Sequence, residues 1–317
     1  MNPATGIATV TLNPAVDQTA AIPNFTVGEV NRVEWEQSDP GGKGVNVASF
    51  LADYRCRVAV TGFLGADNAG LFEELFAQKQ IEDRFVRIAG KTRINVKIID
   101  EVQHQVTDIN FPGQTGTAED ITALKENVAA LAASYPWFVL SGSVPAGIPP
   151  ELYRDLIQLL KRKAKQAVLD TSGVPLKQAI AAAPYAIKPN IDELQELVER
   201  RLNSETEILQ AARQLVHDGI ACVVVSMGKR GAIFVETDAS VLATPPAITV
   251  KSTGGAGDAM VAGLVTGKLR GLSLADCARL ATSFSMGALG QLGPRLPDPN
   301  TVASFMAQVS VRTLSES

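Results

Sequence analysis

The spacing of hydrophobic positions changes repeatedly along the chain and predicts alternating strands and helices. Short β-branched or apolar runs indicate buried strands, and apolar residues recurring every three or four positions indicate amphipathic helices. The predicted strands cover residues 7–12, 58–62, 137–140, 167–170, 185–188, 221–225, 232–236 and 241–251. The predicted helices cover residues 68–79, 117–133, 258–269, 275–290 and 301–309, and others begin near residues 44, 150 and 191. This alternation predicts an α/β fold with a doubly wound, mostly parallel sheet covered by helices on both faces.

One region departs from the alternation and predicts a small inserted β-sheet that would act as a lid. Residues 92–100 and 105–111 alternate like an antiparallel hairpin, and residues 25–37 look like further extended chain. We expect segments 14–38 and 90–113 to form this lid. Its apolar face should cover a site or pair with a second subunit, and it comprises Ile94, Val96, Ile98, Val106, Ile109 and Phe111.

Composition limits the classes of function. Hydrophobic residues make up 46% and charged residues 20%, as in a globular protein, and we expect one domain over residues 1–317 because no linker-like stretch occurs. The net charge of -4 provides no basic field for nucleic acid, and the apolar runs are too short to span a membrane. Because residues 1–6 lack a basic segment, we expect no signal peptide and a cytoplasmic location. The three cysteines are widely separated and indicate reduced core thiols.

The most informative stretch is Ser252-Thr253-Gly254-Gly255-Ala256-Gly257-Asp258, which joins a predicted strand to a predicted helix. Glycines leave the first backbone N–H groups of the helix open, so the turn can bind an anion. One interpretation is a glycine-rich loop in which Asp258 only caps the helix. The other is a phosphoryl-transfer centre, in which the amides of Gly255, Ala256 and Gly257 hold the transferring group and Asp258 accepts the proton of the attacking hydroxyl.

Several upstream residues could contribute to such a centre. Lys43 lies inside a second glycine turn, Gly41-Gly42-Lys43-Gly44, that opens a helix containing Asn46. Arg93 and Asn95 are two positions apart on a predicted strand and therefore share a face. Asp17 follows the first strand, at the sheet edge where open α/β folds bind ligands. Taken alone, Asp17 is more often a turn or cap residue, and a surface charge is the commoner explanation of Arg93.

A further motif, Lys188-Pro189-Asn190-Ile191-Asp192-Glu193, has the spacing of a capping box with Asn190 as the cap. Alternatively, Asn190 and Glu193 could order waters around a metal–nucleotide complex, with Lys188 near the phosphates. Gly228 and Gly231 leave room for a ligand after Ser226, although hairpin geometry also explains them.

Common nucleotide-binding and hydrolase motifs are missing. Neither Gly42-Lys43-Gly44 nor Gly255-Ala256-Gly257 is followed by the third glycine of a dinucleotide fingerprint, and Gly90-Lys91-Thr92 lacks the upstream glycine of a Walker loop. The sequence contains no G-x-S-x-G or H-E-x-x-H motif. Rossmann oxidoreductases, P-loop enzymes, serine hydrolases and zincins are therefore disfavoured.

From end to end the chain resembles the ribokinase-like sugar kinases of the phosphofructokinase B family. The motifs that carry the resemblance are residues 41–48, 140–145, 188–190, 225–228 and 252–258. Residues 13–17, 42–44 and 92–97 are most similar to those of the 1-phosphofructokinase branch. The resemblance implies an ATP- and Mg²⁺-dependent kinase that phosphorylates fructose 1-phosphate at its 6-hydroxyl and dimerises through the lid.

The resemblance also implies roles for individual residues. Asp258 would be the proton acceptor, Asp17 and Asn46 would contact sugar hydroxyls, and Lys43 and Arg93 would clamp the phosphate already on the sugar. Further substrate contacts would come from Gly42, Asn95 and Ser143. Nucleotide contacts would come from Lys188, Asn190, Ser226, Gly228, Gly231, Gly255 and Gly257, and Asn190 and Glu193 would reach Mg²⁺ through water.

Three alternatives remain open on the sequence. The substrate could be tagatose 6-phosphate or fructose 6-phosphate, or the protein could be a non-catalytic sugar-phosphate sensor. Gly254 stands where relatives usually carry Val or Thr, so the turn before Asp258 could be looser here.

Overall fold

The computed structural model describes residues 6–248 and 254–315, and most of its strands form one large sheet. Eleven strands belong to this sheet: β1 (Gly6–Thr11), β4 (Arg57–Gly65), β5 (Glu82–Asp83), β6 (Val86–Ile88), β9 (Trp137–Ser141), β10 (Gln166–Asp170), β11 (Ala186–Ile187), β12 (Cys222–Ser226), β13 (Ala232–Val235), β14 (Ser240–Thr244) and β15 (Ser310–Thr313). Their order is β15-β14-β13-β12-β11-β10-β9-β1-β4-β5, with β6 also on β4.

The sheet is parallel through its centre and antiparallel at one edge. All pairs from β12 across to β5 run parallel, whereas β12, β13, β14 and β15 pair antiparallel in succession. The predicted doubly wound, mostly parallel sheet is therefore confirmed. Because β1, β9 and β10 lie side by side in register, Thr11, Ser141 and Asp170 end in one row at the carboxyl edge.

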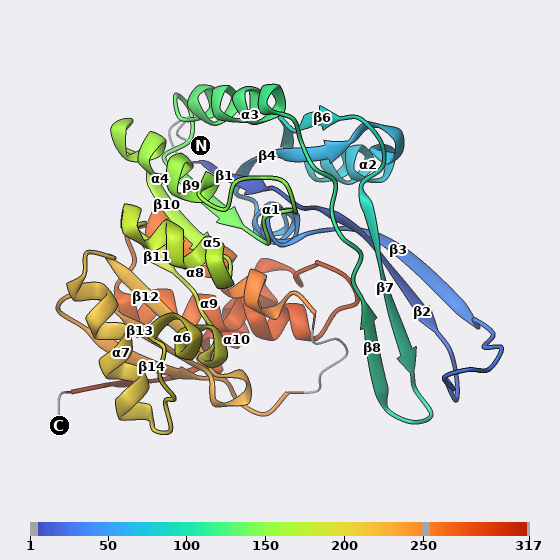
Figure 1. Ribbon diagram of the computed structural model, residues 1–317. Helices are drawn as coiled ribbons and strands as arrows, with labels where there is room; N and C mark the ends of the chain where they lie inside the picture. The colour runs from blue at the N-terminus through green and yellow to red at the C-terminus, as the bar shows by residue number, and fades with distance from the viewer. Residues whose placement is uncertain (1–5, 249–253, 316–317) are drawn as a thin grey trace.

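Helices cover both faces of this sheet (Figure 1). One face packs against α1 (Lys43–Asp53), α2 (Gly70–Lys79), α8 (Ala256–Leu269), α9 (Leu274–Leu289) and α10 (Pro299–Gln308). The other packs against α3 (Ala118–Leu131), α4 (Leu152–Arg162), α5 (Gly173–Ala179), α6 (Ile191–Val198) and α7 (Glu205–His217). Short 3-10 turns occupy Ala66–Asn68, Ile180–Ala182 and Gly228–Arg230.

The core follows from the alternation of side chains along the buried strands. In β1, Ile7 contributes to the hydrophobic cluster beneath α1 and α8, whereas Ala8 and Val10 contribute to the cluster beneath α3 and α4. Each of the three side chains is fully buried. A strand buried on both faces has apolar residues at consecutive positions, which is why these runs identify the central strands in the sequence.

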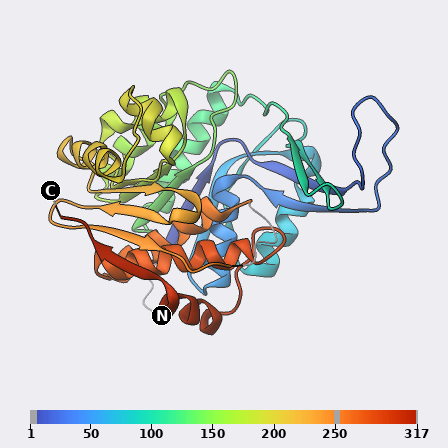
Figure 2. The same cartoon turned by 90° about the horizontal axis from the view of Figure 1, so that it is seen from below.

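The second sheet has four strands in the order β3-β2-β7-β8 and projects from the body of the molecule (Figures 1 and 2). It consists of β2 (Ala15–Ala21), β3 (Trp35–Gly41), β7 (Arg93–Asp100) and β8 (Gln105–Ile109). The predicted hairpin of β7 and β8 is confirmed. The long loop between β2 and β3 extends furthest from the body (Figure 2).

Some details differ from the sequence predictions. Extended chain was predicted over residues 25–37, but the strands are Ala15–Ala21 and Trp35–Gly41, so Asp17 lies in a strand rather than a loop. The register places Val106 opposite Ile99, on the other face from Ile98 and Ile109, so Val106 does not belong to the predicted apolar face.

The strand predicted over residues 241–251 is also shorter. It ends at Thr244, before Pro245 and Pro246, because proline lacks the N–H that a strand ladder needs. The remainder of that prediction beyond Ile248, together with Ser252 and Thr253 of the glycine motif, lies outside the described residues. Strand β15 was not predicted, and it pairs with β14 across about seventy residues of intervening chain.

Candidate active site

Asp258 lies in the first turn of α8 and is 6% exposed. Gly255 caps the helix with a φ of 80°, a left-handed conformation that glycine adopts without a steric penalty. Burial is the main cause that raises the pKa of Asp258, to about 6, and the nearby Asp170 carboxylate adds to the rise, whereas Lys43 and the Asn46 amide oppose it. A carboxyl group with this pKa is ionised at neutral pH and is a stronger base than an exposed aspartate.

The second glycine turn brings another helix to the same place. Gly42 precedes α1 with a φ of 106°, and Asn46 lies one turn into that helix. The Asn46 Nδ2 atom donates a hydrogen bond of 2.8 Å to Oδ2 of Asp258, across 212 positions of sequence. The two predicted glycine turns therefore meet.

A partly buried ion cluster lies beside Asp258. Asp170, at the end of β10 and 1% exposed, lies 3.4 Å from the Nζ atoms of both Lys43 and Lys188. Burial opposes the ionisation of Asp170, but the two lysines outweigh it and hold the pKa of this carboxyl below its usual value. The same carboxylate is the main cause that raises the pKa of Lys43. Lys43 is therefore held as a cation, and the ammonium groups of Lys43 and Lys188 share this carboxylate near the start of α8.

Lys188 is also close to the predicted anion-binding turn. A Cβ atom added to Gly257 would lie 3.3 Å from Nζ of Lys188, so the ammonium group sits against the first turn of α8. The start of a helix already favours anions through its free N–H groups and dipole. The Lys188 ammonium group and the start of α8 together form a site suited to a phosphoryl group.

The predicted nucleotide residues follow along the same sheet edge. Asn190 forms a parallel β-bridge with Ser226, at the ends of neighbouring strands β11 and β12. Gly228 and Gly231 then bracket the 3-10 turn that leads into β13, and both have positive φ angles. A Cβ atom on Gly231 would collide with the Ala243 carbonyl, so packing within the sheet explains this glycine.

Asn190 and Glu193 form the capping box that their spacing predicts. The Asn190 side-chain oxygen accepts a hydrogen bond of 2.8 Å from the backbone N–H of Glu193. The Glu193 carboxylate accepts one of 2.9 Å from the backbone N–H of Asn190. Across the two described ranges, no group of three or more His, Cys, Asp or Glu side chains could hold a metal ion. Mg²⁺ usually keeps several waters and relies on substrate phosphates, so one carboxylate such as Glu193 acting through water is compatible with it.

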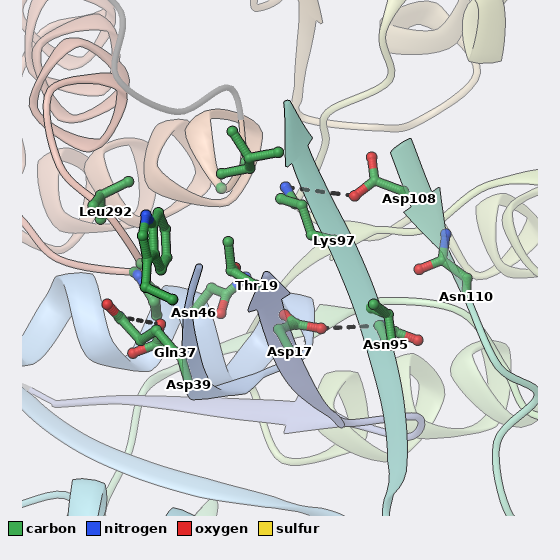
Figure 3. Close-up of a pocket in the computed structure, with 17 residues that line it drawn as sticks. Asp17, Thr19, Gln37, Asp39, Asn46, Asn95, Lys97, Asp108, Asn110 and Leu292 are labelled. Carbon is green, nitrogen blue, oxygen red and sulfur yellow. Dashed lines mark hydrogen bonds and ion pairs between the residues drawn. The ribbon is translucent and has the colours of Figure 1, made fainter. Parts of the chain in front are cut away.

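A cavity of about 350 Å³ lies between the small sheet and the start of α8 (Figure 3). It is lined by Asp17, Asn46 and Asn95 and reaches Gly254 and Gly255. Asn95 donates a hydrogen bond of 3.0 Å to Asp17, and burial raises the pKa of Asp17. Carboxylate and amide groups in a confined cavity suit a ligand with several hydroxyl groups.

Arg93 has an unusual set of partners. Its guanidinium donates to three backbone carbonyls, those of Asn13, Pro14 and Phe111, at 2.9–3.3 Å. No carboxylate of the described part of the chain lies within ion-pair distance of Arg93. These carbonyls orient the planar guanidinium group without neutralising its charge, and burial lowers the pKa of Arg93. Arg93 is therefore suited to bind an incoming anion.

Ser143 is held close to this arginine. Its hydroxyl accepts a hydrogen bond of 3.0 Å from Asn13 Nδ2, and Arg93 binds the Asn13 carbonyl. The preceding Gly142 carbonyl accepts from the buried hydroxyls of Tyr153 and Thr171. These contacts position the loop after β9 beside the predicted substrate residues.

Part of the site was not predicted from the sequence. Asp170 was recognised only as the end of a strand, although its place at the carboxyl edge is the signal that could have identified it. The polar cavity face of the small sheet also includes Gln37, Asp39, Lys97 and Asp108, of which Lys97 and Asp108 form an ion pair (Figure 3). The placement of these four side chains on the cavity face depends on strand register, which the sequence did not reveal.

Comparisons with known proteins agree with this arrangement. A profile described as pfkB family carbohydrate kinase matches residues 1–301. A 1-phosphofructokinase of Rhodobacter capsulatus is 50% identical over 97% of this chain and 98% of its own length. A 1-phosphofructokinase of Xanthomonas campestris is 43% identical over 96% of this chain and 97% of its own.

Solved structures extend the comparison to three dimensions. The crystal structure of phosphofructokinase-2 from Escherichia coli in complex with substrates and products superimposes with a TM-score of 0.90. It shares 27% sequence identity and covers 95% of this chain and 98% of that one. The similarity therefore extends over nearly the whole chain. The chain belongs to the pfkB family of carbohydrate kinases.

Proposed function

We propose that this kinase transfers the γ-phosphoryl group of ATP to the 6-hydroxyl of fructose 1-phosphate, giving fructose 1,6-bisphosphate and ADP. The observation that carries the proposal is the buried base Asp258, at a helix start that adjoins both a polar cavity and two fixed lysines. Near-complete alignment with curated 1-phosphofructokinases supports the choice of substrate.

In the proposed reaction Asp258 accepts the proton of the sugar 6-hydroxyl. The oxygen of that hydroxyl attacks the γ-phosphorus of ATP. The bond to the β–γ bridging oxygen breaks, and ADP leaves. The amides of Gly255, Ala256 and Gly257 stabilise the charge on the transferring group. Lys43 contacts Asp170 and acts electrostatically on Asp258, so its charge also lies at this end of the site.

The sugar is held from the small sheet. Asp17, Asn46 and Asn95 bind its hydroxyls, and Arg93, with Gly42, Lys43 and Ser143 nearby, binds the phosphate already present. Arg93 is oriented by carbonyls and has no carboxylate at ion-pair distance among the described residues. It therefore favours a phosphorylated sugar over a neutral one, which would leave this half-buried charge uncompensated.

The nucleotide is proposed to lie along Lys188, Asn190, Ser226, Gly228 and Gly231, with its phosphates at the start of α8. Glu193 and Asn190 would hold Mg²⁺ through water. When bound, Mg²⁺ neutralises charge on the phosphates.

The decisive experiment compares three acceptors with the purified protein. ADP release is measured with fructose 1-phosphate, tagatose 6-phosphate and fructose 6-phosphate, and we expect the highest kcat/KM with fructose 1-phosphate. Asp258→Asn should lose nearly all turnover while retaining ATP binding by calorimetry. Sugar-phosphate binding without ADP release from any acceptor would refute the kinase proposal in favour of a sensor.

Two further proposals concern assembly and location. We propose a homodimer formed through the small sheet, because Ile94 and Ile109 on it, and Phe111 just beyond β8, are 43–48% exposed. Sedimentation at micromolar concentration tests this, and a monomer would contradict it. A cytoplasmic location is also proposed; no helix within residues 6–248 and 254–315 is long and apolar enough to cross a membrane.

A further inference from the structure

The orientation of the Asn46 side chain is determined by its neighbour. An ionised carboxylate can only accept hydrogen bonds, so the group of Asn46 that faces Asp258 must be the amide nitrogen, not the amide oxygen. The contact is direct, 2.8 Å from Nδ2 of Asn46 to Oδ2 of Asp258. Asn46 belongs to α1, which begins at its own glycine turn, so the amide and the carboxylate lie on two different helices.

We propose that Asn46 is a positioning residue for the base: it occupies Oδ2 of Asp258 and thereby leaves Oδ1 as the atom that accepts the proton from the substrate hydroxyl. The inference rests on the proposed phosphoryl transfer and assigns Asn46 a task beyond contact with the sugar. A carboxylate with one oxygen held by a donor cannot rotate freely, so its other oxygen stays directed at one place.

The amide oxygen of Asn46 supports this assignment. Oδ1 of Asn46 is buried and has no hydrogen-bond partner among the described residues, and Asn46 lines the sugar cavity (Figure 3). A buried acceptor without a partner is unfavourable, and a hydroxyl donor from the ligand would satisfy it. One rigid amide would thus bind the sugar on one side and hold the base on the other.

Other charged groups also shift the pKa of Asp258, so the contribution of the Asn46 amide must be separated from theirs. Lys43 at the start of α1 and Lys188 after β11 favour its charged form, whereas Asp170 at the end of β10 opposes it. None of these groups is removed when Asn46 is replaced. The first turn of α8 also remains in place.

The test measures kcat and kcat/KM between pH 5 and 9 for the wild type, Asn46→Ala and Asn95→Ala. Loss of a hydrogen bond to a charged group should move the acid limb of the Asn46→Ala profile upward by about one pH unit. Asn95 is the matched control, because its amide lies in the same cavity but donates to Asp17. Asn95→Ala should raise KM for the sugar phosphate and leave the acid limb in place.

A second readout needs no turnover. In protein labelled with ¹³C at aspartate carboxyl groups, the Asp258 resonance is identified by its absence in Asp258→Asn. Its titration midpoint should rise in Asn46→Ala, and further in the isosteric Asn46→Asp, where two carboxyl groups compete for one proton. If no ketose phosphate is phosphorylated, the proposed function fails, and this titration still decides the role of Asn46. An unchanged midpoint in both variants would overturn the inference.

Discussion

The proposed catalytic base, Asp258, should destabilise the folded protein, and the cost can be measured without substrate. Burial raises the pKa of Asp258 from 3.8 to about 6, so the folded state prefers the protonated carboxyl. The stabilisation that protonated Asp258 gives the folded state is fully present below pH 3.8 and is lost as the pH rises through about 6. A rise of about two units corresponds to about 3 kcal/mol between these two limits of pH. Little solvent screening is expected because the residue is 6% exposed.

Asp258→Asn removes the charge while keeping the shape and an oxygen that can accept from Asn46. The variant should therefore be more stable than the wild type at pH 8, by about 3 kcal/mol, and by only about half that amount at pH 5. Inactive variants that are more stable than the wild type are expected wherever a site is built at the expense of stability.

Urea unfolding followed by circular dichroism at pH 5 and pH 8 measures the difference. Asp192→Asn, an exposed carboxylate in the first turn of α6, is the matched control and should show no comparable gain. If Asp258→Asn were less stable than the wild type at both pH values, or if its gain did not depend on pH, the argument from burial would be wrong.

Two further outcomes test other parts of the site. Asp170→Asn leaves the ammonium groups of Lys43 and Lys188 without their shared carboxylate, and should reduce the free energy of unfolding by about 3–5 kcal/mol in urea titrations at pH 7. The same change removes a negative charge that raises the pKa of Asp258, so the acid limb of kcat should move to lower pH; an upward shift would contradict this. Arg93→Met removes the cation but keeps much of the side-chain length, and should raise KM for the sugar phosphate by about 10- to 100-fold through the loss of charge-assisted hydrogen bonds. KM for ATP should stay constant in Arg93→Met, and an equal rise in both constants would place Arg93 outside the substrate site.

The sequence was sufficient wherever a structural signal is local. The capping box of Asn190 and Glu193 spans one helical turn, and the alternation in β7 and β8 identifies their hairpin, because each pattern reflects contacts between residues close in the chain. The two glycine turns, before Lys43 and before Asp258, could be recognised for the same reason. The family resemblance depended on these local motifs.

Strand pairing in the small sheet was decided by the tertiary structure. Asp17 faces the cavity because β2 pairs with β3 and β7 in one register, and a shift by one residue would turn it to the other face. Neither the sheet order nor this register leaves a signal within either strand.

The charges of the active site were also decided in three dimensions. Asp170 holds Lys43 across 127 positions and Lys188 from a neighbouring strand, and Asn46 reaches Asp258 across 212. The sequence by itself determined which residues could do chemistry at the carboxyl edge of a parallel sheet. Only the fold decided which of them share a hydrogen bond or a buried charge, because burial and distance depend on elements that pack together from remote parts of the chain.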